Sequence, residues 1–146
     1  MDQRNPQPAQ HAVSAPPKRR ILITDDDEQI HLFFKSALAS LPVSLTFAHN
    51  GLQALAEVKS SRYDLIMLDL LMPESSGGDF MREVKLLAES HPPIIIMSSI
   101  MDADLVRNCL RAGASDFITK PITPSGIREK IRAILYLDDL ASGNPA

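Results

Sequence analysis

Acidic side chains and a lysine stand directly after short apolar runs of this sequence, and they are the groups best suited to chemistry. They are, with two serines, Asp25, Asp26, Asp27, Asp69, Ser98, Ser99 and Lys120. Carboxylates gathered in a small cleft repel one another unless a cation neutralises them. Ligation by carboxylate oxygens favours a hard divalent ion, and Mg²⁺ typically uses one or two carboxylates together with a substrate phosphate. If the apolar runs end at one edge of a sheet, the sequence predicts a Mg²⁺ site with a lysine beside it.

Phosphoryl transfer is the reaction that such a set of groups supports. An ionised aspartate beside Mg²⁺ can attack phosphorus and form an acyl phosphate. The ammonium of Lys120 and the hydroxyl of Ser98 would stabilise the phosphoryl oxygens. The acids follow the apolar residues 21–24 and 65–68, and the lysine follows residues 115–118. Together they favour a site that binds a metal ion and a phosphoryl group.

Each of these residues also has a simpler explanation when it is taken alone. An aspartate at the start of a helix caps free N–H groups, and we expect Asp27 to do so. Asp69 can be a turn residue before Pro73. Lys120 can be a solvated surface lysine. The functional interpretation depends on the combination and not on any one position.

Strands alternate with helices along the chain, and this alternation determines where the charged groups meet. Short apolar runs predict strands at residues 21–24, 43–48, 65–68, 94–97 and 115–118. Apolar residues at helical spacing predict helices at residues 28–40, 51–60, 78–90, 102–112 and from 124 onward. Five βα units predict an α/β fold, a doubly wound five-stranded parallel sheet. Ligands of such sheets bind outside the carboxyl ends of the strands, where the acids and the lysine stand.

Length and composition predict one folded domain between two tails. The chain has 146 residues, of which 45% are hydrophobic, enough for a substantial core. Residues 1–19 are rich in Pro, Gln and Ala, and we expect a disordered tail there. We expect the domain at residues 20–140, followed by a C-terminal tail or the start of a linker at 141–146.

Charge and cysteine content exclude several classes of protein. The net charge is -3 and the basic excess lies in the first twenty residues, so we expect no direct nucleic acid binding by the acidic remainder. Cys109 is the only cysteine, which excludes an internal disulfide and fits a reducing cytoplasm. We expect Cys109 to be a small packed hydrophobic residue. No segment has the length and hydrophobicity of a membrane span, so we expect a cytoplasmic protein without membrane contact.

The histidines give weaker signals. His31, His49 and His91 are scattered along the sequence, and we expect them on helix or loop surfaces without a common site.

Four segments of the chain closely resemble the receiver domain of two-component response regulators, in the CheY-like superfamily. The segments are ILITDDDE, DLIMLDLLMPESSG, PPIIIMSS and RAGASDFITKPI, and the match runs from Arg20 to about Leu140. The resemblance implies a flavodoxin-like fold with the strand order 2-1-3-4-5. It also implies a role in phosphorelay signalling, in which the domain is no enzyme beyond Mg²⁺-dependent self-phosphorylation and autodephosphorylation.

The resemblance assigns a role to each residue of the predicted site. It implies that Asp69 is the phosphoacceptor and that Lys120 stabilises the phosphoryl group. Asp26 would bind Mg²⁺ directly and Asp25 through water. Asp69 and the main-chain carbonyl of Leu71 would complete the protein ligands. The bond between Lys120 and the following proline is expected to be cis.

The same resemblance implies how a signal leaves the site. Ser98 stands at the position of the switch hydroxyl and Phe117 at the position of the switch aromatic. Phosphorylation would draw Ser98 inward, Phe117 would follow, and the face made by residues 102–112, 115–118 and the last helix would change. That face is also a possible homodimer surface.

The implied partners act before and after the domain. A histidine kinase or a histidine phosphotransfer protein would supply the phosphoryl group. A downstream effector protein, or an output domain absent from this chain, would receive the signal.

Two other functions remain open from the sequence. The pair Asp25-x-Asp27 also resembles the nucleophile pair of haloacid dehalogenase-type Mg²⁺ phosphatases, which would make Asp25 the nucleophile but leaves Asp69 and Lys120 unexplained. A receiver-shaped interaction module that is never phosphorylated is the other alternative.

Overall fold

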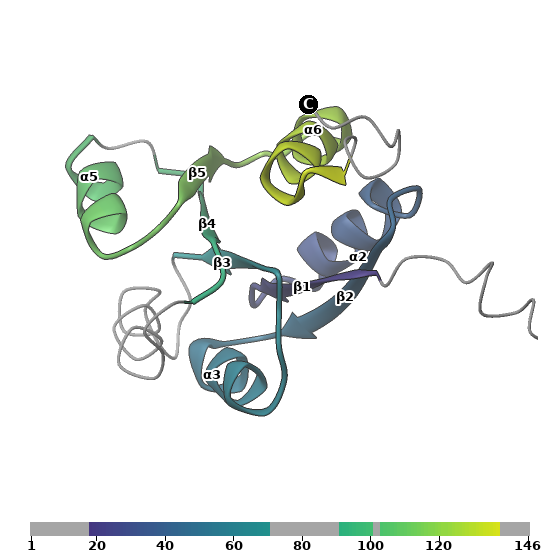
Figure 1. The fold of residues 1–146 in the computed structure, drawn as a ribbon. Coiled ribbons are helices and arrows are strands. Elements are labelled where there is room, and N and C mark those ends of the chain that lie inside the picture. The colour runs from purple at the N-terminus through teal and green to yellow at the C-terminus, as the bar shows by residue number, and fades with distance from the viewer. Residues whose placement is uncertain (1–17, 71–90, 101–102, 138–146) are drawn as a thin grey trace, which may run out of the picture.

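The fold is a parallel sheet covered by helices on both faces (Figure 1). The computed structural model describes residues 18–70, 91–100 and 103–137. Its strands are β1 (Arg19–Thr24), β2 (Val43–Ala48), β3 (Leu65–Asp69), β4 (Ile94–Ser98) and β5 (Asp116–Thr119). Neighbouring strands pair in parallel in the order β2-β1-β3-β4-β5. The predicted fold class and strand order are confirmed.

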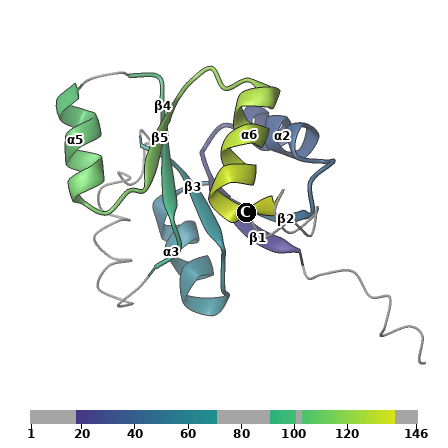
Figure 2. The ribbon, with the colours of Figure 1, turned by 45° about the horizontal axis from the view of Figure 1, so that its top comes forward.

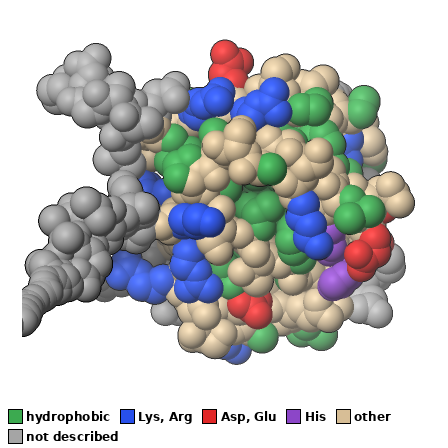
Figure 3. Space-filling model, turned by 90° about the vertical axis from the view of Figure 1, so that its right-hand side faces the viewer, with side chains coloured by type: hydrophobic (Ala, Val, Ile, Leu, Met, Phe, Trp, Pro, Cys, Tyr) green, Lys and Arg blue, Asp and Glu red, His purple; other side chains and the backbone are tan. Residues whose placement is uncertain are grey.

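Of the helices in the described residues, two pack on each face of the sheet. Those described are α2 (Glu28–Ala37), α3 (Gly51–Ser60), α5 (Ala103–Arg111) and α6 (Pro124–Leu135). Figures 1 and 2 show α2 and α6 on one face and α3 and α5 on the other. The side of the molecule seen in Figure 3 carries basic side chains spread among hydrophobic and neutral ones. The helix predicted at residues 78–90 lies outside the described residues.

Most predicted elements are present, with small differences at their ends. The first helix was predicted to reach residue 40 but ends at Ala37, and Leu38 caps it by donating its N–H to the carbonyl oxygen of Phe34. Strand β1 begins at Arg19, one residue before the predicted start of the domain. No helix in the described ranges is long and apolar enough to cross a membrane.

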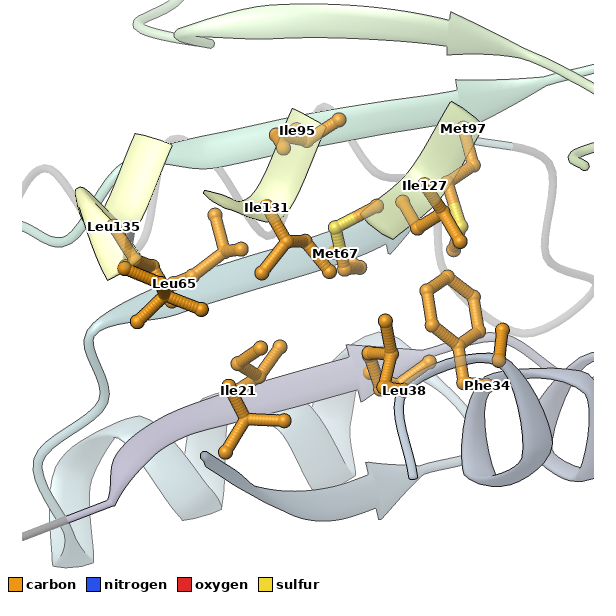
Figure 4. Packing of buried hydrophobic residues seen from close by; sticks show 14 residues of the cluster. Ile21, Phe34, Leu38, Leu65, Met67, Ile95, Met97, Ile127, Ile131 and Leu135 are labelled. Atoms are coloured by element: carbon orange, nitrogen blue, oxygen red, sulfur yellow. The ribbon is translucent and has the colours of Figure 1, made fainter. Parts of the chain in front are cut away.

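The central strands are buried on both faces, and their side chains alternate between two cores. Ile21 and Ile23 of β1 and Met67 of β3 face α2 and α6, where they pack against Phe34 and Ile131 (Figure 4). The intervening residues face α3 and α5. Each large apolar side chain that is fully buried contributes roughly 1.5–3 kcal/mol relative to exposure. The two cores therefore hold the carboxyl ends of β1, β3 and β4 in a fixed register.

Candidate functional site

Three carboxylates meet where β1 and β3 end. The two strands are direct neighbours, with Thr24 opposite Leu68, so the residues that follow these positions share one edge of the sheet. The carboxylate oxygens of Asp25, Asp26 and Asp69 lie within 4.8 Å of one another. Asp25 is fully buried and Asp69 nearly so, whereas Asp26 is exposed. The predicted convergence of the acids is confirmed.

Both the side chain and the main chain of Asp25 form hydrogen bonds. Its Oδ1 accepts a hydrogen bond from the N–H of Asp27 at 2.9 Å, and its Oδ2 accepts one from Nζ of Lys120 at 2.8 Å. Its own N–H donates to the carbonyl oxygen of Ala48 at 3.0 Å. Asp27 begins α2 as its N-cap, accepting a hydrogen bond from the N–H of Gln29, and the predicted capping role is confirmed. Because both of its carboxylate oxygens accept hydrogen bonds, the polar atoms of the buried Asp25 side chain are satisfied.

Lys120 is the cation between the two buried carboxylates. Its Nζ lies 2.8 Å from Oδ2 of Asp25 and 3.6 Å from Oδ1 of Asp69. Burial by itself lowers the pKa of Lys120, but the hydrogen bond with Asp25 and the negative charges of Asp25 and Asp69 outweigh burial and raise the pKa. The lysine therefore keeps its positive charge in the pocket and offsets the repulsion between the acids.

The loop after β5 fixes the backbone of Lys120. Its N–H donates to the carbonyl oxygen of Ser98 at 2.8 Å, which continues the pairing of β4 and β5. The bond between Lys120 and Pro121 is cis, as predicted. The side chain of Lys120 is thus directed across the sheet edge from a position that β4 and β5 define together.

Ser98 and Phe117 lie on neighbouring strands near the acids. Ser98 ends β4 and is 1% exposed, and its Oγ accepts a hydrogen bond from the N–H of Ile100 at 3.0 Å. Phe117 on β5 is half-buried and packs against the core under α3 and α5. The switch roles predicted for Ser98 and Phe117 stay predictions. Leu71, the predicted main-chain metal ligand, lies outside the described residues.

One residue next to this site was misjudged from the sequence. His31 was expected on a surface, but it is 4% exposed, and its Nε2 lies 2.8 Å from the main-chain oxygen of Asp25. The signal available in the sequence was its position on α2, three residues before the buried Phe34. Cys109 is buried as expected.

The donor set fits a hard divalent cation. All three acidic side chains offer oxygen atoms, which are the ligands that Mg²⁺ and Ca²⁺ take in proteins. The exposure of Asp26 gives an ion and its waters a route to the buried acids. In chemical terms the pocket can hold a divalent cation and an anionic group next to a lysine.

Comparisons with known proteins agree with this geometry. The sequence pattern of the response regulator receiver domain matches residues 21–132. The chain is 32% identical over 127 residues to a probable transcriptional regulator, ycf27, of Porphyridium aerugineum, covering 87% of this chain and 52% of that protein. It is 33% identical over 122 residues to the DNA-binding response regulator MtrA of Mycobacterium tuberculosis, covering 84% of this chain and 53% of MtrA. The chain thus spans about half the length of these two relatives.

Solved structures show the same architecture. A two-component response regulator from Clostridium difficile superimposes with a TM-score of 0.76 at 27% identity, covering 82% of this chain and 97% of that one. A CheY-like receiver domain protein from Methanospirillum hungatei gives a TM-score of 0.74 at 25% identity, covering 87% and 99% of the two chains. The similarity therefore extends over nearly all of both solved chains.

Removal of the lysine's charge should destabilise the domain. In the presence of a chelator, we expect Lys120→Met to lower the free energy of unfolding by on the order of 2–4 kcal/mol, because two buried carboxylates lose their counter-charge. Lys130→Met is the matched control. The ion pair of Lys130 with Asp116 is more exposed, so we expect a loss of about 1 kcal/mol or less. Urea unfolding measures both, and equal losses would contradict the role given to Lys120.

Proposed function

Because the chain belongs to the family of response regulator receiver domains, we propose that its carboxylate pocket accepts a phosphoryl group on Asp69. The observation that carries the proposal is the placement of Lys120 between buried Asp25 and Asp69, at 2.8 Å and 3.6 Å. The donor would be a phosphohistidine on a histidine kinase or a histidine phosphotransfer protein. The domain's own chemistry is then limited to Mg²⁺-dependent self-phosphorylation and autodephosphorylation.

In the proposed reaction, a carboxylate oxygen of Asp69 attacks phosphorus. An O–P bond forms to Asp69 while the P–N bond of the donor breaks, and the departing imidazole keeps the electron pair. Lys120 is positioned to pair with the phosphoryl oxygens, since its Nζ already lies close to Oδ1 of Asp69. The fixed carboxylate and ammonium supply orientation without further movement of the backbone.

Asp25, Asp26 and Asp69 would hold Mg²⁺, together with the main-chain carbonyl of Leu71. The support in the structure is the oxygen-only donor set with its atoms within 4.8 Å of one another. When bound, Mg²⁺ would offset the negative charge of the phosphoryl oxygens.

The environment of Asp25 argues against the phosphatase alternative. Both of its carboxylate oxygens already accept hydrogen bonds, from Lys120 and from the N–H of Asp27, and the side chain has no exposed area. A carboxylate in this position is suited to hold neighbours in place and not to attack a substrate. The intact set of three clustered acids with a lysine beside them argues against an interaction module that is never phosphorylated.

We further propose that Ser98 and Phe117 transmit the phosphorylated state. The Oγ of Ser98 now accepts a hydrogen bond from the N–H of Ile100. Turning the hydroxyl toward a phosphoryl group would break this bond and change the loop before α5. Phe117 would move in response, which changes the surface formed by α5, β5 and α6. A downstream effector, an output domain or a second copy of the chain would bind this surface.

The proposed boundaries of the unit are residues 20–140, between the tails at 1–19 and 141–146. A cytoplasmic location is part of the same proposal, since the kinases that would supply the phosphoryl group carry phosphohistidine there.

Phosphoryl acceptance is tested by intact mass. After incubation with a small phosphodonor and Mg²⁺, we expect the wild-type chain to gain one phosphoryl group and Asp69→Asn to gain none, because the nucleophile is lost. Asp116→Asn is the matched control, since Asp116 lies at the opposite end of the sheet, where it pairs with Lys130. It should gain one group like the wild type.

Two other results would contradict the proposal. An unchanged mass in every sample would support the interaction module. Continued hydrolysis of the donor by Asp69→Asn, lost in Asp25→Asn, would support the phosphatase.

The switch is tested by NMR with beryllofluoride as a mimic of the phosphoryl group. We expect beryllofluoride to shift the amide and ring signals of Phe117 in the wild type, and to shift them much less in Ser98→Ala, because no hydroxyl can turn toward the mimic. Ser99→Ala is the control, since Ser99 is exposed. Equal shifts of Phe117 in Ser98→Ala and in the wild type would show that Ser98 does not transmit the signal.

A further inference from the structure

A second group of metal-ligating side chains lies beside the carboxylate pocket and belongs to no step proposed above. Oxygen and nitrogen atoms of Glu28, His31 and His49 lie within 4.8 Å of one another. Glu28 and His31 are three residues apart on α2, so they share one face of the helix. His49 follows β2. A histidine and an acidic side chain also touch at one border of the face seen in Figure 3.

His31 is oriented as a metal ligand would be. Its Nε2 lies 2.8 Å from the main-chain oxygen of Asp25, and because a carbonyl only accepts, this nitrogen carries the proton. In the neutral ring Nδ1 then has a free lone pair, and Nδ1 lies 3.9 Å from Oε1 of Glu28, beyond hydrogen-bond distance. The ring packs against Phe47 at a centroid distance of 4.8 Å. A backbone carbonyl that fixes the tautomer of a histidine is a common support of metal-binding histidines.

The ring of His49 is also held by a neighbouring oxygen, in this case at Nδ1, which leaves Nε2 to face Glu28. Its Nδ1 lies 3.3 Å from Oε1 of Gln53, and its Nε2 lies 2.7 Å from Oε2 of Glu28. The hydrogen bond with Glu28 raises the pKa of His49 despite the opposing effect of burial. The Nε2 atom of His49 and the carboxylate of Glu28 therefore already lie side by side, as two ligands of one ion would.

We propose that Glu28, His31 and His49 bind a divalent transition-metal ion of the Zn²⁺ class, with water in the fourth position. Two imidazoles and one carboxylate are a common ligand set for Zn²⁺ and contrast with the oxygen-only set of the Asp pocket. Neighbouring ligand atoms around tetrahedral Zn²⁺ are about 3.3 Å apart, given bond lengths of roughly 2.0–2.2 Å. The distance from Nε2 of His49 to Oε2 of Glu28 is 2.7 Å, and the distance from Nδ1 of His31 to the other oxygen, Oε1, is 3.9 Å, so the two lie on either side of this value. The side chains of Glu28 and His49 are 71% and 45% exposed, so small rotations can close the site around the ion.

This site goes beyond the proposed function, but it is physically linked to the phosphoryl site. His31 would bind the metal through Nδ1 while its Nε2 holds the main chain of Asp25. An ion here would therefore restrain the segment that carries Asp25 and Asp26.

The test uses Co²⁺ as a spectroscopic probe and Zn²⁺ for calorimetry, on the full chain with saturating Mg²⁺ present to occupy the Asp pocket. We expect one tight site with the intense visible absorption of four-coordinate Co²⁺, displaced by one equivalent of Zn²⁺. His49→Ala and Glu28→Gln should lose this absorption. Gln53→Ala removes the oxygen that contacts both the ring and the main-chain N–H of His49, and it should weaken binding about 10-fold or more.

Three controls separate this site from other sources of binding. His91→Ala removes a histidine elsewhere in the described chain, Asp26→Asn removes an acid of the other cluster, and Asp69→Asn removes the phosphoacceptor. All three should bind Co²⁺ like the wild type, so the result does not depend on phosphoryl acceptance. His49→Ala and Glu28→Gln change exposed side chains, so we expect their circular dichroism spectra to match the wild type, which verifies that they fold. Binding that is absent in the wild type, or that is lost in Asp26→Asn and kept in His49→Ala, would overturn the proposal.

Discussion

Two carboxylates buried side by side at the end of a parallel sheet repel each other, and the ammonium of Lys120 makes their burial tolerable. It lies 2.8 Å from Asp25 and 3.6 Å from Asp69, and the same two charges raise its pKa against the effect of burial. The ion group has little access to water, so its charges interact more strongly than they would on the surface. The rest of the site depends on this balance, because Lys120 offsets only part of the charge of the three clustered carboxylates, which leaves an excess of negative charge for a divalent cation.

The order of the strands explains why a lysine is needed. Strand β5 is three places from β1 in the sheet, which is roughly 14 Å at the usual spacing of strands. The loop after β5 and the long stem of Lys120 cover this distance, and the two partners are 95 residues apart in the sequence. A short cationic side chain at this position would not reach Asp25. The interaction therefore ties the last strand to the first and forms only when the sheet is complete.

Sequence reasoning predicted the features that repeat along the chain. Continuous apolar runs such as residues 65–68 and 94–97 indicated buried parallel strands, and parallel strands bring the residues after them to one edge. Asp25, Asp69 and Lys120 are therefore predicted to lie together from the sequence. The end of the first helix was predicted less well. Residues 38–40 continue an apolar and small pattern, but the helix ends because the backbone of Leu38 leaves the helical conformation, with φ -104° and ψ 8°.

The features that were missed depend on contacts between distant segments. The spacing of His31 from Phe34 indicates the buried face of α2, but the sequence does not show that Phe47 of β2 packs against the His31 ring. For the same reason the closeness of His31 and His49 could not be read from their spacing. The sequence also did not show that Lys120 lies closer to Asp25 than to Asp69. Such preferences arise from side-chain packing after the sheet has formed.

The central claim is that Asp69, and neither Asp25 nor Asp26, forms the bond to phosphorus. Borohydride reduces an acyl phosphate and converts the modified aspartate into homoserine, which peptide mass spectrometry can locate. After phosphorylation of the wild-type chain, the account predicts homoserine at position 69 and unmodified aspartate at positions 25 and 26. Homoserine at position 25 or 26 would contradict the account, because the buried, doubly hydrogen-bonded Asp25 or its exposed neighbour would then be the nucleophile.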